Sequence, residues 1–325
     1  MSPWWRVLNV EPELMPIFER KGSALHYLVR GRGEPVLLIH GLGSSGCDWA
    51  LQVPALESRF RTIVPDLPGC GHSAAPPGDF DIGDLADALW DLLDHLGVER
   101  INIVGFSLGG AVGLEMALRR AHAVPRLALI NSLASYVLDD WHKWFEARMP
   151  AFLIGTLGMR AAAHLAAVRL FPESWQESMR ARARAVIAAV PARTYLGMGL
   201  ALQRWTAIDR LHRLRSRVLL LAAEHDYTPL AEKRAMAARL RAQLVVVRGS
   251  RHGTPFDSIQ TTNASLLAHL SDRELPHPAR WTRDTPAHSR SLSLVGSIAE
   301  EHARVPELLR AARDLRRRQA SEASA

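Results

Sequence analysis

The chain has 325 residues, of which 48% are hydrophobic and 22% are charged, a composition typical of a globular protein with a sizeable core. Its formal charge of +7 comes with a strong preference for Arg over Lys, which favours an Arg-rich surface and leaves an acidic partner or a membrane surface as the alternative. Only two cysteines, Cys47 and Cys70, are present, and no run approaches the roughly 18 apolar residues of a membrane span, so the sequence excludes a disulfide framework and a typical membrane helix.

The first twenty residues lack the basic and then apolar pattern of a signal peptide, so we expect a cytoplasmic enzyme or binding protein.

Predicted strands and helices alternate over most of the chain. A helix is predicted over 81–96, where leucines recur at helical spacing and Gly97 follows. Strands are predicted at the apolar runs 24–29, 35–39, 62–66, 101–104, 127–130, 218–221 and 244–247. Apolar strands that alternate with helices predict an α/β fold, with a mainly parallel sheet and helices on both faces.

The alternation stops between residues 133 and 211. This span is rich in Ala, Arg, Leu and Trp, and it reads as helical with breaks near Pro150, Pro172 and Pro191. It is far too long for a loop in a compact domain. We therefore expect a helical cap at 133–211, inserted into a core made of residues 1–132 and 212–271.

Residues 272–325 form a predicted C-terminal extension. Its first part carries several prolines without periodicity, which predicts a linker or a strap along the surface. Residues 306–318 place apolar side chains on one face and end in three arginines, a pattern that predicts a terminal helix. Those arginines allow a membrane contact, but acidic residues are interspersed and no aromatic platform accompanies them, so we expect a solvated helix end and no nucleic-acid partner.

A serine lies where a predicted strand meets a helical run. The sequence GFSLG at 105–109 fits the pattern G-x-S-x-G, and the helical run after it ends at Arg120. In that setting the serine occupies a strained turn with its hydroxyl exposed, and the glycines let the backbone turn without collision. Ser107 is therefore the candidate nucleophile. The alternative is a serine in a tight turn without any chemistry.

A serine hydroxyl is a poor nucleophile near pH 7 and needs a base, usually a histidine oriented by a carboxylate. Asp226 and His252 each follow one of the last two predicted strands, at the edge where parallel sheets bind ligands. We expect His252 to act as general base and then general acid, and Asp226 to orient it. Glu224, two residues earlier, is the rival carboxylate. A histidine of a surface loop is the alternative for His252.

The carbonyl that is attacked develops negative charge, so hydrogen-bond donors must point at its oxygen. We expect the backbone N–H groups of Leu108, after the nucleophile, and of Leu42, in the loop HGLGSS, to form this oxyanion hole. His40 is expected to structure that loop through hydrogen bonds, because no second ligand lies at the spacing of a metal site. The mechanism needs neither a metal nor an organic cofactor.

Five stretches together resemble the α/β-hydrolase superfamily, in its branch of cap-bearing, esterase-like or lipase-like serine hydrolases. They are HGLGSS (40–45), PDLPGCGHS (65–73), GFSLGG (105–110), AAEHDYTP (222–229) and GSRHGTPF (249–256). The resemblance covers about residues 24–271. It implies a mainly parallel sheet with a cap inserted after the sixth strand, and it places the triad on Ser107, Asp226 and His252.

Two departures from the family pattern stand out. Ser250 and Arg251 precede His252 where the family often has G-x-G-H, and residues 272–325 lie beyond the usual end of the pattern. The family's members that open epoxides or remove halide carry Asp at the nucleophile position. Ser107 argues against both of these activities.

The sequence therefore predicts a serine hydrolase that cleaves a carboxylic ester with a hydrophobic acyl or aryl group through an acyl-enzyme, with an amide or a thioester as the alternative substrate. Phe106, Trp141 and Trp144 are expected to line the substrate pocket, since such pockets are mostly apolar. About half of the aromatic residues of the cap are expected to fill its own core. A carbon–carbon bond hydrolase or an acyltransferase with the same triad, and a non-catalytic ligand-binding protein, remain alternatives. The sequence does not indicate an oligomeric state.

Overall fold

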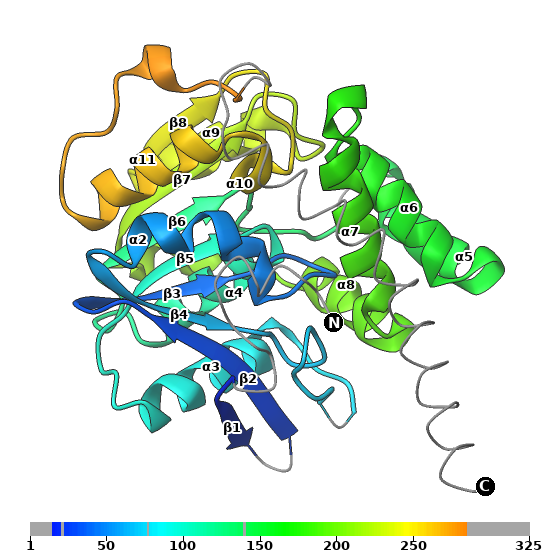
Figure 1. Ribbon diagram of the computed structural model, residues 1–325, viewed down its shortest axis with the longest axis horizontal. Helices are drawn as coiled ribbons and strands as arrows, with labels where there is room; N and C mark the ends of the chain where they lie inside the picture. Colours follow the sequence, from blue (N-terminus) through cyan, green and yellow to red (C-terminus); the bar gives the residue numbers. More distant parts are fainter. Residues whose placement is uncertain (1–14, 21–22, 77, 139–140, 285–325) are drawn as a thin grey trace, which may run out of the picture.

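The computed structural model describes residues 15–20, 23–76, 78–138 and 141–284 (Figure 1). In this part of the chain, eight strands form one sheet in the order β1-β2-β4-β3-β5-β6-β7-β8. They are β1 (Ile17–Arg20), β2 (Ser23–Arg30), β3 (Glu34–Ile39), β4 (Phe60–Pro65), β5 (Asn102–Phe106), β6 (Arg126–Ile130), β7 (Arg217–Ala223) and β8 (Gln243–Val247). The pairs β1–β2 and β2–β4 are antiparallel, and every other pair is parallel. The predicted α/β fold with a mainly parallel sheet is confirmed.

Helices cover both faces of the sheet because both faces of its strands are apolar. In β3, Leu37 belongs to one buried cluster and its neighbours Val36 and Leu38 to the other, as the alternation of a strand requires. One face packs against α3 (Ile82–His95), α4 (Leu108–Arg119) and α9 (Leu230–Leu240). The other packs against η2 (Gly46–Leu51), α2 (Val53–Leu56), α10 (Thr254–Asp257) and α11 (Ile259–Leu270).

A helical insertion separates β6 from β7 and lies to one side of the sheet, in green in Figure 1. It contains α5 (Trp141–Leu157), α6 (Met159–Leu170), η3 (Ser174–Gln176), α7 (Glu177–Ala189) and α8 (Ala192–Gln203), and η4 (Ile208–Arg213) leads back to β7. Pro172 and Pro191 lie at helix boundaries. The expected break near Pro150 is wrong, because α5 continues through it and ends before Gly158, whose φ is +81°. A proline removes a single donor from a helix, whereas a residue with positive φ ends it.

The chain after α11 runs back along the core. It includes η5 (Pro278–Arg280), forms a parallel bridge between Arg248 and Thr282, and brings the Asp284 carboxylate to accept from Ile259 N at 2.8 Å. The predicted terminal helix at 306–318 and the rest of the extension from residue 285 lie outside the described residues. Within the described residues, no single helix has both the length and the apolar composition of a membrane span. One bent pair, 174–189 with 192–203, meets both criteria together.

Candidate active site

Ser107 lies on a strained turn between β5 and α4. Its φ of 54° and ψ of −117° are outside the regions that non-glycine residues ordinarily adopt. A Cβ on Gly105 would lie 2.3 Å from Gly109 O, and a Cβ on Gly109 would lie 2.2 Å from Ile39 O. The two glycines are therefore required by close backbone contacts, and they hold the serine above the end of its strand.

The three residues predicted as a triad meet at the carboxyl ends of β5, β7 and β8. His252 Nε2 lies 2.9 Å from Ser107 Oγ, and His252 Nδ1 lies 2.8 Å from Asp226 Oδ1. The side chains of His252 and Asp226 are 4% and 1% exposed. Since β5, β6, β7 and β8 are parallel neighbours, the loops after them converge at one sheet edge. The geometry is that of a nucleophile, a base and an orienting carboxylate.

Glu224, the rival for the carboxylate position, does not reach His252. Its side chain is 41% exposed, and its Oε2 accepts a hydrogen bond from Gly249 N at 2.8 Å. This hydrogen bond holds the turn after β8, to which Gly249 belongs. Asp226 is the carboxylate that contacts the imidazole.

Asp226 also contacts a buried lysine that the sequence analysis did not single out. Lys233 Nζ, from the first turns of α9, donates to Asp226 Oδ2, and its side chain is fully buried. Thr228 Oγ1 donates to the same oxygen at 2.8 Å. Burial by itself raises the pKa of Asp226, but the charges of His252 and Lys233 outweigh burial and hold that pKa well below its usual value. The triad carboxylate is therefore fixed as an anion by three side chains.

The loop that carries His252 is anchored by buried polar side chains. Asn131, at the end of β6, donates through Nδ2 to His252 O at 2.8 Å and accepts from Ala223 N at 2.7 Å. Asp257 accepts from Ser250 Oγ at 2.7 Å, and its burial raises its pKa to about 6. These bonds tie the histidine loop to β6 and β7. They fix the imidazole although the loop lacks the glycine before the histidine that is common in the family.

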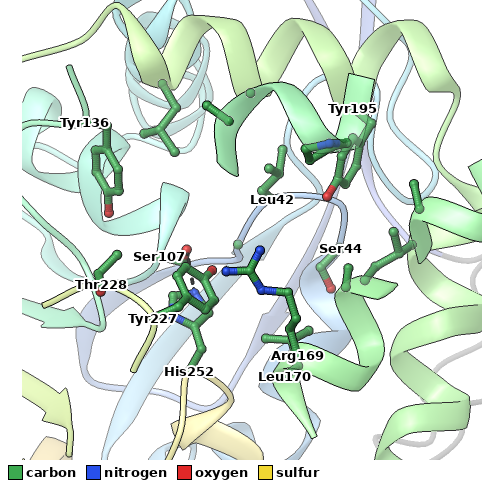
Figure 2. Close-up of a pocket in the computed structure, with 18 of the residues that line it drawn as sticks. Leu42, Ser44, Ser107, Tyr136, Arg169, Leu170, Tyr195, Tyr227, Thr228 and His252 are labelled. Atoms are coloured by element: carbon green, nitrogen blue, oxygen red, sulfur yellow. Dashed lines mark hydrogen bonds between the residues drawn. The ribbon is translucent and has the colours of Figure 1, made fainter. Parts of the chain in front are cut away.

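The predicted oxyanion-hole residues lie on either side of the nucleophile. Leu108 begins α4, where the first backbone N–H groups have no acceptor within the helix. Leu42 lines the cavity above Ser107 (Figure 2). His40 is buried; its Nδ1 lies 2.9 Å from Gly41 O, and Leu67 N donates to its Nε2 at 3.0 Å. As predicted, His40 holds the loop through hydrogen bonds. That the backbone N–H groups of Leu42 and Leu108 bind an oxyanion stays a prediction.

A cavity of about 710 Å³ opens in front of Ser107, between the sheet edge and the insertion. Phe106, Leu133 and the aliphatic side chains of α5, α6 and α8 supply most of its wall. Ligand sites for small molecules have this size and this mostly apolar lining. Phe106 is placed as predicted, with its ring centroid 5.3 Å from that of His252.

Trp141 and Trp144 do not line the cavity, so the prediction that they bind substrate is corrected. Their side chains are 69% and 52% exposed, on the outer side of α5. Pro150 and Leu153 are among the α5 residues that face the cavity instead. Polar and apolar residues are mixed around α5 without a separate apolar face, so its sequence does not show which face turns inward.

Cys47 and Cys70 are buried free thiols, and burial raises the pKa of Cys70. In the part of the chain that the structure describes, no group of three or more His, Cys, Asp or Glu side chains has the arrangement of a metal site.

Comparison with known proteins places this geometry in context. A family model for the alpha/beta hydrolase fold matches residues 34–258. The putative carbamate hydrolase RutD of Caulobacter segnis is 31% identical over 253 residues, which are 74% of this chain and 92% of the relative. The enol-lactonase from Burkholderia xenovorans LB400 superposes with a TM-score of 0.72 at 26% identity and covers 79% of this chain and 100% of its own. A malate-bound thermophilic esterase from Thermogutta terrifontis superposes with a TM-score of 0.70 at 27% identity, and the match covers 79% of this chain and 97% of the esterase.

Proposed function

The chain belongs to the alpha/beta hydrolase family, and from this premise we propose that it is a serine hydrolase that cleaves a carboxylic ester through an acyl-enzyme on Ser107. The observation that carries the proposal is the hydrogen-bonded series Asp226–His252–Ser107 beneath a largely apolar cavity. A nucleophile, its base and the group that orients the base are thus within hydrogen-bond reach of one another.

In the first half of the reaction, His252 Nε2 takes the proton of Ser107 Oγ as the oxygen attacks the ester carbonyl. The Asp226 carboxylate stabilises the imidazolium that forms, and Lys233 and Thr228 keep the carboxylate in place. The oxyanion is assigned to the backbone N–H groups of Leu42 and Leu108. His252 then gives its proton to the leaving alcohol, and the acyl group stays on Ser107.

In the second half, a water molecule gives a proton to His252 and attacks the acyl-enzyme carbonyl. The tetrahedral intermediate collapses, Ser107 Oγ recovers its proton from His252, and the carboxylic acid leaves. Because the wall around Ser107 is mostly aliphatic, a hydrophobic acyl or aryl group fits the proposed reaction. The relative named as a putative carbamate hydrolase makes a carbamate the first nitrogen-containing substrate to test.

A fluorophosphonate probe and a panel of p-nitrophenyl esters test this proposal. The probe should label the native protein at Ser107, and Ser107→Ala should abolish labelling and reduce kcat/KM for p-nitrophenyl butyrate by several powers of ten. Glu224→Gln is the matched control and should keep both. A native protein that folds normally, resists the probe and turns over no ester would favour the non-catalytic alternative.

Product analysis separates the hydrolytic alternatives that use the same three residues. A carbon–carbon bond hydrolase should cleave a vinylogous diketone and leave simple esters intact. An acyltransferase should give more ester than acid when an alcohol acceptor is added. We expect the acid and the alcohol of the starting ester to be the main products.

A further inference from the structure

A segment beyond the part of the chain that the family model matches is joined to the loop that carries His252. This return segment, residues 278–284, follows α11 and is orange in Figure 1. Arg248, the first residue after β8, is bonded to it twice: Arg248 N donates to Trp281 O, and Arg283 N donates to Arg248 O, both at 2.9 Å. The return segment therefore pairs with the chain at the point where that loop begins.

The last residue of the return segment holds the other end of the loop. Asp284 is 8% exposed; its carboxylate accepts from Ile259 N at 2.8 Å, and its N–H donates to Asp257 O at 2.9 Å. The Asp257 carboxylate in turn accepts from Ser250 Oγ at 2.7 Å and from Arg251 N at 3.3 Å. These two residues directly precede the triad histidine. A series of hydrogen bonds thus leads from the return segment to the backbone beside the imidazole.

Other contacts hold the return segment in this place. On α11, Thr261 Oγ1 donates to Thr282 O at 2.9 Å. On the insertion, Glu173 Oε1 lies 3.6 Å from Arg283 Nη1. The segment is thus fixed against β8, against α11 and against the insertion. It can therefore serve as a rigid support for the loop beside it.

The position of His252 is what such a support would control. His252 Nε2 lies 2.9 Å from Ser107 Oγ, and a base must stay within hydrogen-bond reach of the proton that it takes. A displacement of about 1 Å can lower the rate of a reaction by about 100-fold. Asn131 bonds the loop to the sheet at His252 O, whereas the return segment acts on the residues before it. The two supports therefore hold different parts of the same loop.

We propose that the return segment is a positioning element for His252 and that Asp284 is the residue through which it acts. This inference rests on the proposed function, because it concerns the base of the same reaction. Asp284 acts through Asp257, and thus through the backbone beside the imidazole. The alternative is that the segment only stabilises the fold, through the packing of Trp281 on an apolar cluster of the core. The two roles differ in their effect on kcat.

Steady-state turnover of p-nitrophenyl butyrate by Asp284 variants separates these roles, at a temperature at which circular dichroism shows each variant to be folded. In Asp284→Ala, kcat should fall by about 10- to 100-fold with little change in KM, because the base is displaced and the cavity is not. Fluorophosphonate labelling of Ser107 should slow by a similar factor, since it depends on the same base. Asp284→Asn keeps an oxygen that can accept from Ile259 N and should recover most of the loss.

Glu274→Ala is the matched control, because Glu274 is an exposed carboxylate outside the return segment. It should keep the native kcat. Hydrogen exchange of the backbone amides of residues 248–257 measures the loop without any substrate. Exchange there should be faster in Asp284→Ala than in the native protein, and it should be unchanged in Glu274→Ala.

A folded Asp284→Ala protein with the native kcat would overturn the inference, even if it unfolded at a lower temperature, because the return segment would then only add stability. Unchanged hydrogen exchange at 248–257 in that variant would also overturn it. Either result is compatible with ester hydrolysis at Ser107, so the proposed function would stand. A native protein that neither reacts with the probe nor turns over any ester would instead remove the proposed function and this inference with it.

Discussion

The sheet core and the helical insertion contribute to one site, but they are built on different principles. The core buries two extensive apolar clusters, one on each face of the sheet. The insertion has a small cluster of its own, made of Ala163, Ile187, Val190 and Tyr195 with a few partly buried neighbours. Its first helix leaves large apolar side chains on the surface: Trp141, Trp144, Phe145, Phe152 and Leu157.

The same contrast holds for the functional side chains. The triad lies on loops that close packing and buried hydrogen bonds fix, through Asn131 and Lys233 for example. The aliphatic wall of the cavity lies on helices with a much thinner core. The difference suggests a division of labour in which the core provides the chemistry and the insertion selects the substrate. Substitutions in the two regions should therefore have effects of different kinds.

The largest expected effect comes from the core carboxylate. Asp226→Asn keeps the shape of the side chain but removes the charge that orients and stabilises His252, so we expect kcat to fall about 10⁴-fold. The measurement is ester turnover at pH 7. Glu224→Gln, two residues away and outside the triad, should stay within twofold of the native protein. Equal losses in the two variants would mean that the orienting carboxylate is misassigned.

The buried lysine behind the triad should matter next. Lys233→Met removes the ammonium and leaves Asp226 buried with fewer partners, which should lower the free energy of unfolding by about 3 to 5 kcal/mol. Urea unfolding measures this loss. Arg234→Met, on the exposed side of the same helix, is the control and should change stability by less than about 0.5 kcal/mol. If Lys233→Met were as stable as the control, the ion pair would not hold the site together.

The junction between core and insertion gives the third test. Glu115 on α4 accepts hydrogen bonds from Trp205, after α8, and from Arg210, in η4. Glu115→Gln should lower the free energy of unfolding at pH 7 by about 1.5 to 3 kcal/mol, the range for a hydrogen bond to a charged group. Asp87→Asn is the control, because its half-exposed carboxylate binds Arg119 on the surface.

The same variant should change how stability depends on pH. Burial raises the pKa of Glu115, but the bonds from Arg210, Trp205 and Arg119 outweigh burial and lower that pKa to about 2, from 4.5. Between these values the unfolded chain binds a proton that the folded chain does not. The native protein therefore loses this contribution as pH falls from about 4.5 to 2, and Glu115→Gln should lose less. Parallel pH dependence in the two proteins would show that the junction adds nothing.

The comparison of regions also explains what the sequence could predict. The central strands are short apolar runs, and their alternation with helices indicates a parallel sheet directly. Ser107, Asp226 and His252 each follow such a strand, so topology alone brings them to one edge. β1, with the sequence IFER, was missed because it is only four residues long and its two apolar residues precede two charged ones, so it lacks the alternation that marks a strand.

Lys233 could not be predicted because it follows Glu232 and precedes Arg234, and nothing local distinguishes the buried cation from the exposed one. Its burial depends on the packing of α9 against the sheet. The inward face of α5 was unpredictable for a related reason, since its polar and apolar residues are mixed around the helix and no polar stripe marks the outside. Trp141 and Trp144 were therefore assigned to the wrong side.

The smallest expected effect belongs to that outer side. Trp144 is 52% exposed and contacts Arg148, whose guanidinium lies 5.3 Å from its ring centre. Because an exposed cation–π contact contributes about 0.5 to 1 kcal/mol, Trp144→Ala should lower the free energy of unfolding by no more than that. Since the ring lies outside the cavity, kcat/KM for esters should stay within twofold.

Trp205→Phe is the matched tryptophan substitution, because Trp205 is 8% exposed and donates to Glu115 at the junction. It should lower the free energy of unfolding by more than Trp144→Ala does, since a buried charged acceptor loses a donor. If Trp144→Ala instead raised KM for long acyl esters, α5 would have to turn during catalysis and present its outer face to the substrate. The insertion would then be a moving part of the site, and its weak core would be what permits the motion.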